Sequence, residues 1–255
     1  MKNKIFEKFD DAIADIPDGA TIMMFFWGVA GTPQNLIRTL QDKGIKDLTL
    51  ISHNFVPGFL GDHLLIDKVI TPFALVNQIK KLITAWPGTG TILGIESPLA
   101  KLVKEGTVEL EITSHGVLVE RIRAGGSGIG GFYSPIGVGT VLEEGKEKRV
   151  IDGKEFILEK PLKAQFGFVR AYKADKRGNL IYRGSGRGCN PIIAMASDIT
   201  IAEVDEIVEV GELDPEIIVT PGIFVDRIVK IPDGGLSSYS QRAALLREVF
   251  QGGEK

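Results

Sequence analysis

A strand, a glycine-containing turn, a helix and a second strand follow one another between residues 21 and 51. The apolar run from Thr21 to Phe25 is typical of a buried strand. Thr32 and Pro33 favour the start of a helix, as N-cap and first helical residue, and Gly44 favours its end. Because parallel strands need a long crossover, usually a helix, this βαβ unit predicts an α/β fold. We expect an open, largely parallel sheet with flanking helices.

Patterns elsewhere extend this prediction. Apolar residues from Ile5 to Ile16 recur at spacings of three and four, which predicts an opening helix. An Asp152-Gly153 pair inside the apolar segment 150–158 predicts a β-hairpin. Seven glycines in the twenty residues 121–140 argue against regular structure there.

The length of 255 residues suits one α/β domain, which we expect over residues 1–233. Residues 234–255 are predicted to form an amphipathic helix, over 243–250, and a polar tail. The net charge of −3 argues against nucleic acid and anionic membrane surfaces as partners. The longest apolar run, 22–30, is far shorter than the roughly 18 residues of a membrane span. The single cysteine, Cys189, excludes an internal disulfide and suits a cytoplasmic protein.

Four groups of residues could carry chemistry. The turn before the predicted helix at Thr32 would offer backbone N–H groups to a phosphate, a carboxylate or an oxyanion, unless it is an ordinary βα turn. The glycine-rich segment 125–140 suits backbone that approaches a ligand closely, or a surface loop. The three histidines are His53, His63 and His115. They share no metal-ligand spacing, so no metal site is predicted. A group of five cations could face phosphate oxygens, although a solvated hairpin is the simpler interpretation of this segment. These cations are Lys173, Lys176, Arg177, Arg183 and Arg187.

No nucleophile can be identified from the residues alone. The sequence has no Gly-x-Ser-x-Gly motif, and Cys189 has no partner base that the sequence makes evident. Carboxylates are plentiful but no spacing marks a catalytic pair: Glu96, Glu120, Glu159, Glu203 and Glu212. The residues alone therefore predict an α/β protein that binds a ligand.

Four stretches of the sequence resemble the A (alpha) subunit of the family I coenzyme A transferases. They are DGATIM…GTPQNLI, VERIRAGGSGIGGFYSPIGVGT, CNPIIAMA and VEVGELDPEIIVTPGIFVDRIV, and the resemblance covers about residues 1–230. It implies an open α/β sheet of the CoA-transferase type. It also implies an enzyme that combines this chain with a B (beta) chain, as an A2B2 hetero-oligomer, with coenzyme A as substrate and no permanently bound cofactor.

The resemblance further implies a ping-pong reaction between an acyl-CoA and a free carboxylic acid. A glutamate attacks the acyl-CoA, and a glutamyl-CoA thioester then passes CoA to the acceptor acid. The nucleophilic glutamate belongs to a Ser-Glu-Asn-Gly type motif of the beta chain, and no such motif occurs here. This chain alone is therefore expected to be inactive.

The resemblance also supplies candidate site residues. The alpha-subunit pattern D-G-x-x-(apolar)-G-G-F-x-x-x-G-x-P contributes to CoA binding, and Asp18, Gly19, Gly31 and Pro33 match it. It implies a CoA-binding segment made of Phe25, Phe26, Trp27, Gly28, Val29, Ala30 and Gly31. It implies a substrate pocket made of His115, Gly125, Gly126, Ser127 and Gly128.

Three departures from the family pattern stand out. Phe25, Phe26 and Trp27 occupy the Gly-Gly-Phe positions, which removes room for a close backbone approach. His115 stands where relatives commonly have glutamine, and the segment 69–77 is longer than its counterpart. We expect these changes to reflect an acyl substrate that is bulkier or less polar than acetoacetate or succinate.

Other functions stay open at this point. The same assembly could use water as the acceptor and act as a CoA-thioester hydrolase. The chain could instead be a non-catalytic subunit that binds CoA or an acid, or a regulatory subunit if the altered glycine pattern means that CoA is no longer bound. A sugar-phosphate isomerase of related fold is less consistent with the sequence, because its site motifs do not occur here.

Overall fold

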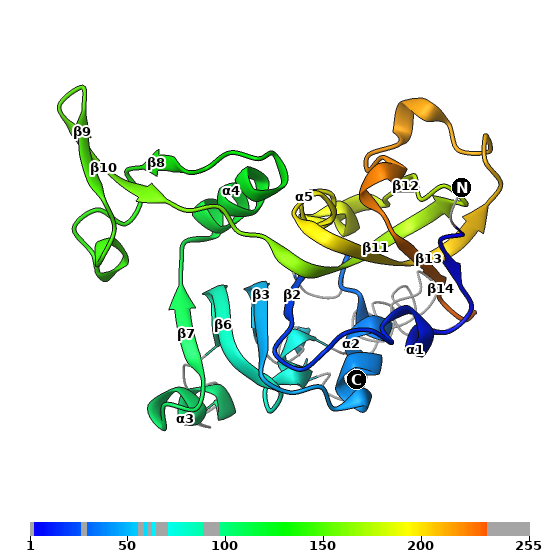
Figure 1. Cartoon of the computed structure of the whole chain (residues 1–255), viewed down its shortest axis with the longest axis horizontal. Coiled ribbons are helices and arrows are strands. Elements are labelled where there is room, and N and C mark those ends of the chain that lie inside the picture. Colours follow the sequence, from blue (N-terminus) through cyan, green and yellow to red (C-terminus); the bar gives the residue numbers. More distant parts are fainter. Residues whose placement is uncertain are drawn as a thin grey trace, which may run out of the picture.

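The structure is a computed structural model, and it describes residues 3–26, 30–55, 59–60, 63–64, 71–88 and 97–233. The described residues form a nine-stranded sheet with helices on both faces (Figure 1). Its strands are β1 (Ile5–Phe6), β2 (Thr21–Met24), β3 (Leu48–Asn54), β6 (Ile79–Trp86), β7 (Glu109–Ile112), β11 (Ala164–Asp175), β12 (Leu180–Ile181), β13 (Ser197–Val208) and β14 (Arg227–Lys230).

The strand order is β1-β14-β13-β11-β2-β3-β6-β7, and all neighbours along this path are parallel. Within the described sheet only β12 is antiparallel, where it pairs with β11. From β2 the chain builds the sheet in one direction through β3, β6 and β7. It then returns to the other side of β2 with β11, so the strand order reverses between β2 and β11. The predicted α/β fold with a largely parallel sheet is confirmed.

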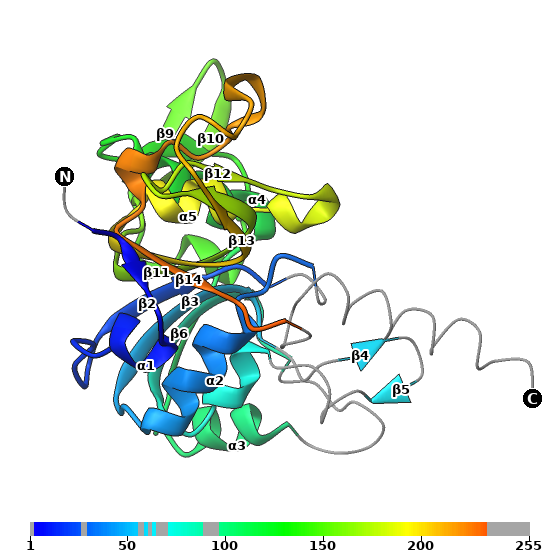
Figure 2. The same cartoon turned by 90° about the vertical axis from the view of Figure 1, so that its right-hand side faces the viewer.

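Alternate residues of the buried strand β2 point to opposite faces of the sheet. Ile22 and Met24 belong to a hydrophobic core shared with α1 (Phe9–Ala12), α2 (Gln34–Lys43) and α3 (Pro98–Lys104). Met23 belongs to a second core shared with α4 (His115–Gly126) and α5 (Asn190–Met195). The two helix layers lie on opposite sides of the sheet in Figure 2. This arrangement explains why β2 is apolar on both faces.

A small arm projects from the main body (Figure 1). It consists of β8 (Phe132–Ser134), β9 (Lys148–Ile151) and β10 (Lys154–Glu159), in the order β8-β10-β9. The predicted hairpin is confirmed here, because Asp152 and Gly153 form its turn with φ angles of 49° and 76°. Asparagine, aspartate and glycine are the residues that tolerate such angles best.

Short elements complete the described chain. They are β4 (Phe59–Leu60), β5 (His63–Leu64) and the 3₁₀ helices Pro72–Leu75, Val141–Glu143, Gly184–Arg187, Pro215–Ile217 and Gly222–Phe224. None of the described helices is long and apolar enough to cross a membrane.

Three sequence predictions need correction. The opening helix is only α1, because Ile5 and Phe6 instead form β1 and pair with Ile228 and Val229 of β14. The helix after the turn begins at Gln34, one residue later than expected. The segment 121–140 is not irregular throughout, since α4 continues to Gly126 and β8 follows it. The predicted helix at 243–250 lies outside the described residues, and the domain boundary at 233 stays a prediction.

Candidate functional site

The reversal of strand order between β2 and β11 marks the candidate site. In open α/β sheets, ligands bind outside the carboxyl ends of the strands at such a switch point. Side chains meet at this edge from the end of β2, the end of β3, the start of α4 and the start of α5. They include Phe25, His53, Asn54, His115 and Cys189.

The two phenylalanines after β2 pack into the protein. Phe25 and Phe26 are 6% and 3% exposed. The Phe25 ring lies edge-on to His53, with ring centroids 5.5 Å apart, and on its other side it covers Gly188, where any Cβ would overlap the ring. The aromatic side chain thus fills the space that a smaller residue would leave at the base of the switch point.

The end of the predicted CoA-binding segment is held to the loop before α5. Asn190 donates hydrogen bonds from Nδ2 to the carbonyl oxygens of Gly31 (3.0 Å) and Gly186 (3.1 Å). Gly31 has a φ of 71°, and a Cβ there would overlap the Gly186 oxygen, so only glycine fits. Ala30, the residue before Gly31, is half-buried. Trp27, Gly28 and Val29 lie outside the described residues.

The first turn of α2 holds a carboxylate of the protein itself. Glu203, which is 0% exposed, accepts hydrogen bonds from the backbone N–H groups of Asn35 (2.9 Å) and Leu36 (3.0 Å). Its Oε1 lies 3.7 Å from Nε of Arg170, which is 2% exposed. The prediction that this helix start offers its N–H groups to a ligand is therefore wrong for these two groups, because Glu203 already satisfies them.

Two histidines stand side by side at the ends of β3 and α4. Their ring centroids are 6.0 Å apart. His115 is the first residue of α4, and its Nε2 lies 2.9 Å from Oδ1 of Asn54. Ser114 caps this helix by accepting a hydrogen bond from the Val117 N–H (3.3 Å). The carboxyl edge therefore brings His115 together with Asn54 and His53, which the sequence did not connect with it. The assignment of His115 to a substrate pocket stays a prediction.

His53 also contacts the single cysteine. Its Nε2 lies 3.6 Å from Sγ of Cys189, although the two residues are 136 positions apart in the sequence. Burial, helped by the neighbouring His115, lowers the pKa of His53 to about 4, and burial raises the pKa of Cys189 to about 11. At neutral pH the pair is therefore an uncharged imidazole and an uncharged thiol. It offers hydrogen bonds but no resting thiolate nucleophile.

The predicted pocket residues at the other end of α4 are separate from His115. His115 and Gly126 are 11 positions apart in the helix, a rise of about 16 Å. A Cβ at Gly125 would overlap the Leu162 carbonyl oxygen, and one at Gly126 would lie 2.7 Å from Cβ of Met195. Close packing thus accounts for these two glycines. The assignment of Gly125, Gly126, Ser127 and Gly128 to a substrate pocket stays a prediction.

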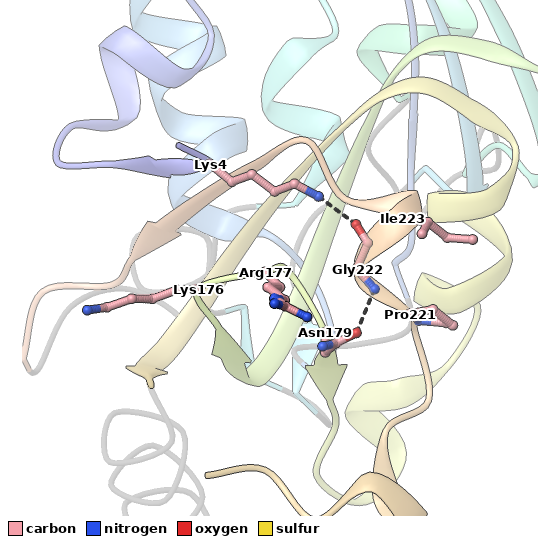
Figure 3. Close-up of a pocket in the computed structure, with 7 residues that line it drawn as sticks. All are labelled: Lys4, Lys176, Arg177, Asn179, Pro221, Gly222 and Ile223. Atoms are coloured by element: carbon pink, nitrogen blue, oxygen red, sulfur yellow. Dashed lines mark hydrogen bonds between the residues drawn. The ribbon is translucent and has the colours of Figure 1, made fainter. Parts of the chain in front are cut away.

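The predicted cation cluster is divided. Lys173 pairs with Glu206 (2.6 Å) and Lys176 pairs with Glu209. The Arg183 guanidinium lies 5.3 Å from the centroid of the Tyr172 ring, and Arg187 is exposed. Lys176 and Arg177 line a cavity beside the β11–β12 hairpin (Figure 3).

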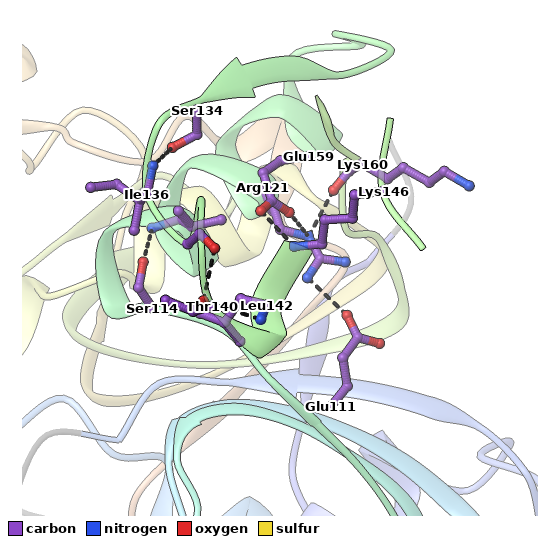
Figure 4. A network of polar contacts seen from close by, with 12 residues as sticks. Glu111, Ser114, Arg121, Ser134, Ile136, Thr140, Leu142, Lys146, Glu159 and Lys160 are labelled. Atoms are coloured by element: carbon purple, nitrogen blue, oxygen red, sulfur yellow. Dashed lines mark hydrogen bonds and ion pairs between the residues drawn. The ribbon is translucent and has the colours of Figure 1, made fainter. Parts of the chain in front are cut away.

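A polar network joins the arm to the main body (Figure 4). The Arg121 guanidinium donates to the carbonyl oxygen of Lys160 and to Oε1 of Glu111, both at 2.8 Å. Glu159 is buried and pairs with Lys146 at 2.6 Å. Burial opposes ionisation of Glu111, but Arg121 and Lys81 hold its pKa below the usual value. These charges compensate one another, so Glu159 is part of the framework and has no free carboxylate for catalysis.

Across the described ranges, no three His, Cys, Asp or Glu side chains gather into a group that could hold a metal ion. The third departure, the segment 69–77, is described from residue 71 and contains the 3₁₀ helix Pro72–Leu75.

Comparison with known proteins decides the family. The model of the coenzyme A transferase family matches residues 6–231. The chain belongs to this family. It is 43% identical to the A (alpha) subunit of the 3-oxoadipate CoA-transferase of Pseudomonas putida, over 94% of this chain and 99% of that one. It is 41% identical to the alpha subunit of the acetate CoA-transferase of Escherichia coli, over 90% of this chain and 97% of that one.

Solved CoA-transferases share the fold. An acyl-CoA transferase of Escherichia coli O157:H7, solved as a thioester complex with CoA, matches with a TM-score of 0.75 and 22% identity. The match covers 94% of this chain and 49% of that one. Glutaconate CoA-transferase of Acidaminococcus fermentans matches with a TM-score of 0.73 and 18% identity, over 91% and 76%. At these identities the two structures support the fold only.

Proposed function

We propose that this chain is the alpha subunit of a heteromeric CoA-transferase that moves CoA from an acyl-CoA to a free carboxylic acid. The observation that carries the proposal is its similarity to CoA-transferase alpha subunits over nearly their whole length. Because these relatives are alpha subunits, we infer that this chain also has a beta partner. The A2B2 stoichiometry and the cytoplasmic location stay predictions.

We place the nucleophilic glutamate on the beta partner. In the described part of the carboxyl edge, the Cys189 thiol is uncharged at neutral pH, and the Glu203 carboxylate is occupied by α2 and Arg170. Neither group suits attack on a thioester. In the proposed cycle the partner's glutamate attacks the acyl carbonyl and expels the CoA thiolate. The thiolate then attacks the resulting anhydride at the glutamyl carbonyl and releases the first acid.

The acceptor acid completes the cycle. Its carboxylate attacks the glutamyl-CoA thioester and expels the CoA thiolate, which then attacks the acceptor acyl carbonyl and frees the glutamate. Interactions with the CoA body away from the reacting carbonyl would supply binding energy for these steps. We assign that contact to the segment from Phe25 to Gly31, and contact with the acid to His115, whose ring is oriented by Asn54.

The composition of the edge supports an apolar acyl group. Phe25 is an apolar residue and His53 and Cys189 are uncharged at neutral pH, so these three offer no ionic partner to a second carboxylate on the acid. We propose that the preferred acid is bulkier or less polar than acetoacetate or succinate.

The ratio of rates on a bulky monocarboxylic acid and on succinate tests this preference. In the complex with the beta partner, the double change Phe25→Gly and Phe26→Gly is expected to lower that ratio by about tenfold, because it removes a large apolar contact. Phe25→Leu with Phe26→Leu is the matched control and should retain most of the preference. An unchanged ratio in the glycine variant would contradict the proposal. Using a ratio cancels differences in the amount of folded enzyme.

The proposed function itself is tested by affinity purification of this chain from its native host. We expect a partner of similar size, with a Ser-Glu-Asn-Gly type motif, and CoA transfer by the complex. Release of CoA without any acceptor acid would instead indicate a thioester hydrolase. A complex that binds neither CoA nor acids would indicate a regulatory role.

A further inference from the structure

A cavity of about 390 Å³ lies beside the β11–β12 hairpin, and it shares no residue with the carboxyl-edge site. Figure 3 shows its lining, which consists of Lys4, Lys176, Arg177, Asn179, Pro221, Gly222 and Ile223. The volume falls within the range of small-molecule sites. Three of the seven residues are cationic and none is acidic.

The positive charges of this cavity are only partly compensated. Lys176 pairs with Glu209. Lys4 donates from Nζ to the carbonyl oxygen of Gly222 (2.7 Å), which carries no net charge. Among the residues that the structure describes, no carboxylate pairs with the Lys4 ammonium or with the Arg177 guanidinium, and Asp175 binds only the backbone N–H of Arg177. An ammonium with further N–H donors and a complete guanidinium fork are therefore available to an anion.

The floor of the cavity is fixed before any ligand binds. The buried Asp175 accepts hydrogen bonds from the N–H groups of Arg177 (2.9 Å) and Asn179 (3.0 Å) and from the Asn179 side chain (2.7 Å). Oδ1 of Asn179 in turn accepts from the Gly222 N–H (2.8 Å). A Cβ at Gly222 would overlap the Arg177 carbonyl oxygen, so the two backbone segments touch directly. Such preorganisation lowers the entropic cost of binding.

We propose that this cavity binds a phosphate monoester that carries an apolar or aromatic group. A phosphate monoester bears close to two negative charges at neutral pH, which match the charges of Lys4 and Arg177. The planar guanidinium can bind two phosphate oxygens at once. Pro221 and Ile223, the latter 84% exposed, also line the cavity and offer apolar surface to the organic part of the ligand. A monocarboxylate would leave one of the two cations without a partner.

Calorimetric titration of the full chain with phenyl phosphate, in a phosphate-free buffer, tests the proposal. We expect saturable binding that weakens by about tenfold in Arg177→Gln and also weakens in Lys4→Gln. Arg149→Gln is the matched control, because it removes the same charge from the exposed arm, and its affinity should stay within about twofold of the wild type. The absence of saturable binding would overturn the proposal, and so would equal affinity in wild type and Arg177→Gln.

A competition experiment identifies the source of the phosphate. Displacement of phenyl phosphate by CoA but not by dephospho-CoA would assign the cavity to the 3′-phosphate of CoA. Displacement by neither would assign it to another phosphorylated molecule, and both results support the site. Because the titration needs no transferase activity, its failure leaves the proposed function untouched.

Discussion

The contact between His53 and Cys189 shows what single residues contribute to this site. Each side chain alone could serve as a base or a nucleophile. Burial keeps both uncharged at neutral pH, and for His53 the nearby His115 adds to this effect. A proton would have to move from a thiol with a pKa of about 11 to an imidazole with a pKa of about 4 to create an ion pair. The pair therefore favours hydrogen bonding over nucleophilic attack.

The reactivity of Cys189 follows from its raised pKa. Because it is the only cysteine in the chain, iodoacetamide labelling reports on it alone. We expect alkylation at pH 7.5 to be about 30-fold slower in the folded chain than in the same chain unfolded in urea. The fraction of thiolate falls by more than about 30-fold, but the thiolate of a thiol with a higher pKa is more nucleophilic, and this offsets part of the loss in rate. Labelling as fast as in the unfolded chain would show that the thiol is ionised.

The lowered pKa of His53 predicts a dependence of stability on pH. An unfolded histidine binds a proton near pH 6.5, whereas the folded state resists protonation until about pH 4. The unfolded state thus binds more protons between these values, so stability should fall on acidification from pH 6.5 to 4. The contribution of His53 to this loss is up to about 3 kcal/mol. Urea titrations at several pH values should show a shallower fall for His53→Gln, and parallel curves would contradict the assignment.

The sequence singled out His115 but not its neighbours, for a physical reason. Asn54 and Cys189 reach His115 and His53 through the pairing of β3 with β2 and the packing of α5 on the sheet. Neither event leaves a local pattern in the sequence. In the sequence Glu203 is only one of several carboxylates, because its role as a cap for α2 depends on contacts with residues 167 and 168 positions away.

At the scale of elements, local sequence patterns predict a helix or strand correctly where tertiary packing favours the same structure. The βαβ unit was predicted with its helix end at Gly44, which adopts a φ of 68° as a C-cap. The glycine-rich end of α4 was not predicted, because glycine weakens an isolated helix. In the folded chain this helix is stabilised by burying Leu118 and Ile122, and its last glycines permit close contact with Leu162 and Met195.

Substitutions at two glycines of α4 distinguish the effect of close packing on stability from the effect of helix propensity. Gly125→Ala should lower the free energy of unfolding by about 2 kcal/mol, since a Cβ would overlap the Leu162 carbonyl oxygen. Gly116→Ala lies in the same helix with no atom within 4 Å of the added Cβ, so it should raise stability by about 0.5–1 kcal/mol. Urea denaturation measures both changes. Equal effects of the two substitutions would show that α4 does not pack as described.

At the scale of the whole molecule, the sheet is assembled from two halves that meet at β2 and β11. The first half follows from local βαβ patterns, whereas β1 pairs with β14 more than 220 residues along the chain. The two residues of β1 fit an amphipathic helix equally well, so the prediction of an opening helix was reasonable but wrong. The meeting of the halves creates the carboxyl edge, and we propose that this edge is only part of an active site.

Mass spectrometry can show which of the two chains, this one or its proposed beta partner, carries the nucleophile. We propose that this chain provides binding surface while the partner provides the nucleophile. The complex is incubated with a panel of acyl-CoA donors and analysed for covalent adducts. We expect a CoA adduct on a glutamate of the partner, none on this chain, and no CoA transfer by this chain alone. A CoA or acyl adduct on this chain, above all on Cys189 or Glu203, would contradict that division.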